Sequence, residues 1–426
     1  MLFPVLATLL ISQATLPASA PVRAHIPPSE KAKSLLTLGA RIGAKNTKIE
    51  RPETLETFFL ALDGLVTRTR TDHVHIVTFG NSLISADNVT NVVRERLVER
   101  FGDGGRGLVL TDRIADYGNR LRSGYAPKGA WLSYNLAMGP KGRGVFGLSG
   151  VIHEAAGYAT TEWRLNGETE AELFYLDHKD TRSFSLKIDG APFMQIEPLK
   201  DGGGKALHFT LPATAKRLQL TASRGNVTIF GLTLEKPSPG IVFDTIGIPA
   251  AEAASYLIAK EDIAQAQLKS RRPTLLMFML GGNEIRRLSW ARANSVAQRK
   301  EQLEQEFRAL IERMQAAAPD AACLAVGPID AVYGQSSPMK LKTRPQVDDL
   351  NAIERKVAEE KGCAYYDLYA AMGGKGSLEK FSKNAMLHDD LVHPKGRGLD
   401  LLGELLAQAI MQAYADTVPT KLAQKP

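Results

Sequence analysis

The sequence predicts an α/β protein built on a doubly wound parallel sheet, with an antiparallel β-sandwich inserted into it. Apolar strand-like runs alternate with amphipathic helical runs in both the N-terminal and the C-terminal parts of the chain. Between them, residues 129–239 carry short alternating runs separated by Asp-Gly, Gly-Gly-Gly and Pro turns. We therefore expect the main domain to comprise residues 21–128 and 240–426, and the sandwich to comprise residues 129–239.

The N-terminus predicts export. Residues 1–11 are apolar, and Ala18 and Ala20 provide the small side chains expected before a signal peptidase cleavage site. We expect residues 1–20 to be a signal peptide and the mature protein to be periplasmic or secreted. A short membrane anchor is the alternative, because no Lys or Arg precedes the apolar run and Pro21 follows the expected cut. No later run is long and apolar enough to cross a bilayer, so stable membrane insertion is not expected after cleavage.

Charge and cysteine content narrow the function classes. The net charge of +7 is spread along the chain, which is typical of a solvated surface. The functional alternative is attraction to an anionic envelope polymer such as peptidoglycan. No basic-aromatic cluster indicates nucleic-acid binding. Cys323 and Cys363 are the only cysteines, so there is no disulfide framework; two buried thiols are the default, and one disulfide is the alternative in an oxidising compartment.

The first expected strand and helix contain the first candidate for catalysis. Two amphipathic helices, at 30–40 and 53–67, precede a buried strand at 75–79. After Gly80, Ser85 or Asp87 can cap a helix that ends at Gly102. A serine between a strand end and a helix N-terminus suits a nucleophile whose attack creates an oxyanion, so Ser82 is the candidate. A simple capping role is the alternative.

The remaining elements follow the same plan. The insert contributes short strands, and the run 274–280 is almost continuously apolar, as a sheet covered on both faces requires. Helices and strands then alternate to the end of the chain, which indicates parallel pairing. The expected strands are 241–246, 274–280, 323–326 and 363–368, and the expected helices are 296–318, 347–360 and 396–414.

Two further polar stretches are expected at the same sheet edge as Ser82. The first, Gly281-Gly282-Asn283-Glu284, directly follows an expected strand. The second contains Asp390 and His393 just before the last helix. A histidine three residues after an aspartate can donate its Nδ1 proton to that carboxylate and keep Nε2 free to accept a proton from a serine. No His, Asp and Glu set has metal-ligand spacing, so neither a metal nor another cofactor is expected.

The order Gly-x-Ser, Gly-x-Asn, Asp-x-x-His on an alternating α/β pattern resembles the SGNH (GDSL-type) hydrolases. The sequence of residues 94–107 and the presence of a β-rich insert resemble the periplasmic branch of this family, which includes peptidoglycan O-acetylesterases. The resemblance implies a flavodoxin-like hydrolase fold over roughly residues 72–413. It also implies that Ser82 is the nucleophile, that Asp390 and His393 complete the triad, and that Asn283 is an oxyanion donor.

The resemblance places a second oxyanion donor in Gly247-Ile248-Pro249-Ala250, and here the chain departs from the family pattern. Ala250 occupies the usual glycine position, and Pro249 has no N–H, so the donor must be Ala250 or Gly247. Asn81 is a second departure, because the family usually has aspartate beside the nucleophile.

The function implied is hydrolysis of acyl esters, with O-acetyl groups of an acetylated envelope polysaccharide such as peptidoglycan as the expected substrate. Ser82 would form an acyl-enzyme, and His393 would carry the proton. One alternative is an O-acetyltransferase that passes the acetyl group to a sugar. The other is a polysaccharide-binding protein whose catalytic site has decayed, an idea motivated by Asn81 and Ala250.

Overall fold

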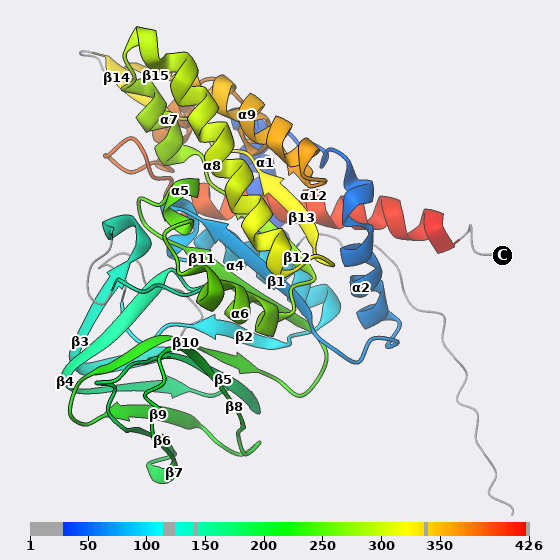
Figure 1. The fold of residues 1–426 in the computed structure, drawn as a ribbon. Helices are drawn as coiled ribbons and strands as arrows, with labels where there is room; N and C mark the ends of the chain where they lie inside the picture. Colours follow the sequence, from blue (N-terminus) through cyan, green and yellow to red (C-terminus); the bar gives the residue numbers. More distant parts are fainter. Residues whose placement is uncertain (1–28, 114–123, 140–143, 336–339, 423–426) are drawn as a thin grey trace, which may run out of the picture.

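The structure is a computed structural model that describes residues 29–113, 124–139, 144–335 and 340–422. The expected signal peptide lies outside these residues. A parallel sheet flanked by helices forms one part of the molecule, and a β-rich region lies against one edge of it (Figure 1). Within the described ranges, no helix combines the length and the apolar character that a membrane span needs.

The parallel sheet has five strands in the order β11-β1-β12-β13-β16. Numbered by appearance within this sheet, the order is 2-1-3-4-5, the flavodoxin-like arrangement, so the predicted parallel α/β core is confirmed. Register places Gly80, the last residue of β1, beside Gly247 and Met279, the last residues of β11 and β12. The strands are β1 (Val74–Gly80), β11 (Ile241–Gly247), β12 (Leu275–Met279), β13 (Ala322–Val326) and β16 (Ala364–Tyr366).

Helices cover both faces of this sheet because successive strand residues point to opposite sides. Ile76 and Met277 pack into one apolar cluster, whereas Val77 and Phe278 pack into another. The first cluster includes side chains of α1 (Glu30–Ile42), η1 (Pro52–Leu55), α2 (Glu56–Val66), α4 (Asn88–Phe101), α10 (Leu368–Ala371), α11 (Ser377–Lys383) and α12 (Arg397–Leu422). The second includes side chains of α5 (Ala253–Tyr256), α6 (Glu261–Arg271), α8 (Val296–Ala317) and α9 (Gln346–Glu360).

The β-rich region is antiparallel, as predicted, but its strands form one hydrogen-bonded sheet of nine strands. The two-sheet sandwich is therefore not confirmed. The sheet also begins earlier than the expected boundary at residue 129, because β2 pairs with β10. Its strands are β2 (Gly105–Val109), β3 (Tyr125–Asn135), β4 (Val151–Arg164), β5 (Glu170–Asp177), β6 (Phe184–Ile188), β7 (Ala191–Ile196), β8 (Gly203–Thr210), β9 (Arg217–Ala222) and β10 (Val227–Glu235).

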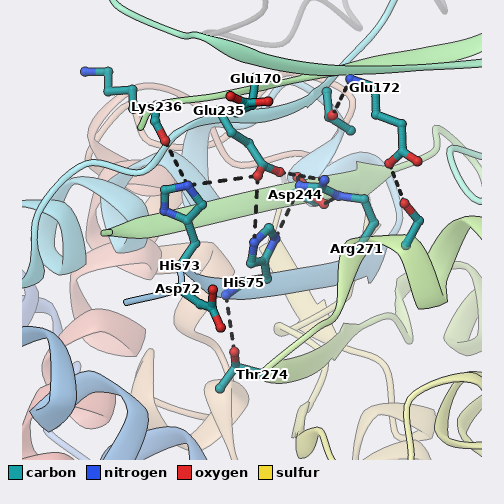
Figure 2. Close-up of polar contacts among 12 residues, drawn as sticks. Asp72, His73, His75, Glu170, Glu172, Glu235, Lys236, Asp244, Arg271 and Thr274 are labelled. Carbon is teal, nitrogen blue, oxygen red and sulfur yellow. Dashed lines mark hydrogen bonds and ion pairs between the residues drawn. The ribbon is translucent and has the colours of Figure 1, made fainter. Parts of the chain in front are cut away.

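A buried ionic cluster joins the β-rich region to the parallel sheet (Figure 2). Arg271 of α6 contacts Asp244 of β11 at 2.7 Å and Glu235 of β10 at 2.6 Å. His75 of β1 lies 3.4 Å from Arg271, and burial followed by the charge of Arg271 holds the pKa of His75 well below its usual value. A neutral His75 can pack beside the guanidinium without charge repulsion. The cluster thus fixes the β-rich region to the edge of the sheet.

Cys323 and Cys363 form a disulfide. Cys323 belongs to β13, and Cys363 immediately precedes β16, the neighbouring strand. Of the two alternatives left open by the sequence, the structure has the disulfide. The bond closes a loop that contains all of α9.

Candidate active site

Ser82 lies just after the carboxyl end of β1, next to strand ends that the hydroxyl of Tyr256 holds together. Tyr256 donates its hydroxyl proton toward the carbonyl oxygens of Gly80 (2.6 Å) and Ile246 (2.7 Å), and the Gly80 N–H donates to the same hydroxyl (3.2 Å). The ends of β1 and β11 are thereby linked directly beneath the serine. Ser82 then begins a short helix, α3 (Ser82–Ser85).

Asn81 caps this short helix. Its Oδ1 accepts a hydrogen bond from the Leu83 N–H at 3.0 Å, and its side chain is buried. An aspartate would offer the same acceptor, so the asparagine keeps the local geometry of the turn. Ser85 or Asp87 was expected to cap the helix that ends at Gly102, which is α4. Asp87 does precede α4, but in a left-handed conformation with φ 66° and without a capping hydrogen bond.

Asp87 instead belongs to a buried polar network behind α3. Arg94 donates to its two carboxylate oxygens at 2.7 and 2.8 Å, and Thr90 and Thr245 donate to Oδ1. Burial opposes ionisation, but the Arg94 charge and these hydrogen bonds outweigh it and lower the pKa of Asp87. The network ties the segment after Ser82 to β11 and so limits movement of the serine.

Ser82, His393 and Asp390 form a continuous hydrogen-bonded chain. The Ser82 Oγ lies 2.9 Å from His393 Nε2, and His393 Nδ1 lies 2.7 Å from Asp390 Oδ2. Both distances are within hydrogen-bond reach, so His393 can accept the serine proton while Asp390 fixes its tautomer. The structure therefore brings Ser82 together with two residues that lie more than 300 positions further along the sequence.

The loop around Asp390 is organised by its own backbone. Asp390 Oδ1 accepts the N–H groups of Val392 (2.8 Å) and His393 (3.0 Å), and the His388 N–H donates to the His393 carbonyl at 2.8 Å. Partial burial would raise the pKa of Asp390, but hydrogen bonds from the ring and amide of His393 and from the Val392 amide lower it to about 2. Asp390 is therefore a carboxylate throughout the neutral range.

Asn283 lies at the start of α7 (Gly282–Ser289), directly after β12. Its Nδ2 donates to the Ala251 carbonyl at 2.9 Å, which uses one of its two N–H bonds and leaves the other for a ligand. This contact also draws the turn at residues 248–251 against the asparagine. Asn283 lines the same pocket as Ser82 and His393.

The turn that contains Ala250 explains why glycine is common at this position. The Ala251 N–H donates to the Ile248 carbonyl at 3.1 Å, Pro249 is the second residue of the turn, and Ala250 has φ 62°. This is the pattern of a type II turn, whose third residue favours glycine because it needs a positive φ. The alanine adopts the conformation at a cost of about 1–2 kcal/mol.

Gly247 and Ala250 are placed differently with respect to the serine. Gly247 is the last residue of β11 and is buried; a Cβ there would lie 2.6 Å from the Ser85 amide nitrogen. The absence of a side chain at Gly247 therefore allows α3 to pass close to the end of β11. Ala250 is exposed, and its N–H makes no hydrogen bond with another described residue. Neither residue lines the pocket around Ser82, although Asn283 connects the Ala250 turn to that pocket.

Two buried carboxyl groups support the loop before Asn283. Glu284 accepts the N–H groups of Ala253 (2.9 Å) and Gly281 (3.1 Å), and Glu354 lies against Gly281. Burial, and then the neighbouring Glu252 charge, raise the pKa of Glu284 to about 7 despite the amide hydrogen bonds. Burial and the charge of Glu284 raise the pKa of Glu354 well above its usual value. Burial thus favours the protonated form of both carboxyl groups.

A pocket of about 710 Å³ surrounds the serine and the histidine. Its walls come from the turn at Ser82, the start of α7, strand β14 (Val332–Gln335), Arg344 just after β15 (Lys340–Thr343), and the loop before α12. His393 and Asp390 are partly open to solvent, with side chains 41% and 47% exposed. Water can therefore reach the base. Across the described ranges, no group of three or more His, Cys, Asp or Glu side chains is arranged to hold a metal ion.

Several residues that shape the site were not predicted. Tyr256 and Arg94 act on the serine turn through hydrogen bonds over large sequence separations, and no local motif marks them. Arg286 and Arg344 also line the pocket. Arg286 follows Asn283 by three residues on α7, a helix that the sequence analysis did not predict, so this spacing was not used as a signal.

Comparisons with known proteins give a family match and a shared fold. Residues 221–401 match the GDSL-like lipase/acylhydrolase family. A solved peptidoglycan O-acetylesterase is 18% identical, with a TM-score of 0.70 over 85% of this chain and 97% of that one, which shows a shared fold. A lipase/acylhydrolase from Enterococcus faecalis is 17% identical over 41% of this chain and 77% of its own, with a TM-score of 0.28. No curated protein sequence matches the chain.

The match begins inside the β-rich region and ends in α12, so it includes Asn283, Asp390 and His393 but not Ser82. The structure supplies the missing part, because it places Ser82 beside His393 at the edge of the five-stranded sheet. Residues 221–401 are thus similar to the GDSL-like lipase/acylhydrolase family, and the fold resembles that of a peptidoglycan O-acetylesterase.

Proposed function

We propose that this protein removes O-acetyl groups from an envelope polysaccharide such as peptidoglycan, through an acetyl-serine intermediate at Ser82. The observation that carries the proposal is the hydrogen-bonded chain from Ser82 through His393 to Asp390. The peptidoglycan O-acetylesterase that shares the fold supports the choice of acetyl ester and polysaccharide.

In the first half of the reaction, His393 Nε2 takes the proton of Ser82 as its Oγ attacks the carbonyl carbon of the ester. The negative charge that develops on the carbonyl oxygen is stabilised by N–H donors, for which the Ser82 amide, the Ala250 amide and the Asn283 side chain are the candidates. The tetrahedral intermediate then breaks its bond to the sugar oxygen. His393 delivers the proton to that oxygen, and the deacetylated sugar leaves.

In the second half, His393 takes a proton from water while the hydroxide oxygen attacks the acetyl-serine carbonyl. Collapse releases acetate and returns the proton to Ser82 Oγ. The exposure of His393 and Asp390 supports hydrolysis over transfer to a sugar, because solvent reaches the base. The cap made by Asn81 argues against a decayed catalytic site. With asparagine in place of the family's usual aspartate, the turn at Ser82 keeps its hydrogen bond.

We also propose that the protein acts outside the cytoplasm and that its β-rich insert belongs to the recognition of polymeric substrate. A disulfide between Cys323 and Cys363 is the kind of cross-link that persists in oxidising compartments. The insert is fixed to the hydrolase sheet by the Arg271 cluster, so it can present a constant surface beside the catalytic part.

Acetate release from O-acetylated peptidoglycan tests the proposal. The purified protein should release acetate, and Ser82→Ala should lose this activity while it keeps the fold, as judged by circular dichroism. Peptidoglycan that has been chemically deacetylated is the matched substrate control. Equal acetate release by the wild type and Ser82→Ala, or no release above the uncatalysed rate by the wild type, would contradict the proposal.

A further inference from the structure

Helix α7 carries a second set of polar and aromatic side chains in line with Asn283. Arg286 and Trp290 follow Asn283 by three and seven residues, a spacing that places all three on one side of the helix. The Arg286 guanidinium lies 5.3 Å from the centre of the Trp290 ring, and the ring is 71% exposed. The helix that presents the proposed oxyanion donor thus also presents an arginine and an open aromatic face.

A second such pair lies at the strands β14 and β15; of the first pair, only Arg286 lines the pocket around Ser82. Tyr333 and Arg344 both line it, and the Arg344 guanidinium lies 5.6 Å from the centre of the Tyr333 ring. Arg344 is held in place by its backbone N–H, which donates to Ala331, and by its Nη1, which donates to Ser289 at the end of α7. The hairpin and α7 therefore meet through Arg344.

Neither arginine is neutralised by a carboxylate. Arg286 and Arg344 make no ion pair with any residue that the structure describes. Two carboxyl groups line the same pocket, but both have other partners: Asp390 binds His393, and Asp330 accepts hydrogen bonds from Ser377 and Leu378. The pocket thus offers two guanidinium groups to a ligand, with nine N–H bonds besides the one that Arg344 donates to Ser289.

The chemistry of these groups specifies a class of ligand. Guanidinium groups form paired hydrogen bonds with carboxylates and phosphates, and an exposed tryptophan provides a flat apolar surface on which a sugar ring can lie. A neutral ester would leave both charges without a partner. We propose that Arg286 and Arg344, with the faces of Trp290 and Tyr333, form a subsite for an anionic substituent, a carboxylate or a phosphate, on the sugar that carries the scissile ester.

This inference rests on the proposed function, because it assigns the substrate class of the same pocket. It predicts that the enzyme prefers an O-acetylated methyl glucuronoside over the methyl amide of the same compound, which is neutral and of similar size. An O-acetylated methyl glucoside 6-phosphate distinguishes phosphate from carboxylate. The measured quantity is kcat/KM for acetate release from each ester.

Arg286→Gln and Arg344→Gln should each lower kcat/KM for the anionic esters by about ten- to a hundredfold, since each removes a hydrogen bond to a charged group. The value for the neutral amide should stay near that of the wild type, which also shows that each variant is folded. Arg224→Gln removes the same charge from an exposed turn of the β-rich region and should alter neither value. Arg344→Lys should retain part of the preference, because it retains the charge.

Raising the salt concentration should reduce the preference of the wild type for anionic esters, because ions screen exposed charges. It should have little effect on a variant that carries both Arg286→Gln and Arg344→Gln. Equal kcat/KM values for anionic and neutral esters in the wild type would overturn the subsite and leave the esterase proposal intact. So would a loss of activity in the arginine variants that is equal for both kinds of ester. If neither ester is hydrolysed, and Ser82→Ala behaves like the wild type, the proposed function fails and the subsite fails with it.

Discussion

Replacing Asp390 by asparagine should disable the base with little change to the loop that holds it. In the wild type, Asp390 Oδ1 accepts two backbone N–H groups at 2.8 and 3.0 Å, and Oδ2 accepts the ring of His393 at 2.7 Å. The amide oxygen of an asparagine can keep the two backbone hydrogen bonds. Its NH₂ group must then face His393 Nδ1, where the wild type has an acceptor.

A donor at this position reverses the tautomer of His393. Nδ1 would become the acceptor, and the proton would lie on Nε2, which points at Ser82 Oγ across 2.9 Å. In that state Nε2 cannot accept the serine proton. The corresponding change in serine hydrolases lowers kcat by about 10⁴-fold, equivalent to about 5 kcal/mol of activation free energy.

The assay is steady-state hydrolysis of 4-nitrophenyl acetate, which needs neither the β-rich region nor the arginine subsite. Asp390→Asn should lose kcat while its melting temperature remains close to that of the wild type, because the backbone hydrogen bonds are kept and the side chain is 47% exposed. Asp389→Asn, the same change one residue earlier, is the control. A variant at position 390 that keeps more than about a tenth of wild-type kcat would refute the role of Asp390 as the residue that orients His393.

Three further changes test other parts of the structure. Ala250→Gly should raise the free energy of unfolding by up to about 1 kcal/mol in urea denaturation, because it relieves the positive φ of the type II turn; lower stability would contradict the assigned turn. Cys323→Ser with Cys363→Ser should lower stability by about 4 kcal/mol, from the loop-closure entropy of a 40-residue separation, and a reductant should destabilise the wild type but not this variant. The pKa of Glu284 is raised from 4.5 to about 7, so between these pH values the folded state holds a proton that the unfolded chain has released, and stability should fall as pH rises from about 4.5 to about 7. Glu354→Gln should weaken this dependence by removing the second carboxyl, and an unchanged pH profile of urea unfolding would show that the pair does not share protons.

Much of the parallel sheet could be predicted because local sequence patterns indicate its strands. The apolar run at 274–280 and the glycines after it indicate a buried strand that leads into a loop. Parallel strands bring such loops to one edge of the sheet. Ser82 and Asn283 became candidates in this way, whereas Asp390 and His393 were chosen for their spacing just before the last helix. The structure places all four around one pocket.

The contacts that sequence analysis missed are those between distant segments. Pairing of β2 with β10 depends on a register that spans the whole insert, and no local pattern marks it. The same is true of Tyr256, whose hydroxyl serves two strand ends, and of Arg344, which reaches the pocket from a hairpin. The left-handed conformation of Ala250 was also hidden, because alanine rarely adopts it.

The proposal that Ser82 forms an acyl-enzyme can be tested most directly by trapping that intermediate. The protein would be mixed with 4-nitrophenyl acetate, quenched in acid within the first turnovers, digested and examined by mass spectrometry. The account predicts one acetyl group on the peptide that contains Ser82, and none on the corresponding peptide of Ser82→Ala. Acetyl on a different residue in both proteins, with equal turnover, would contradict it.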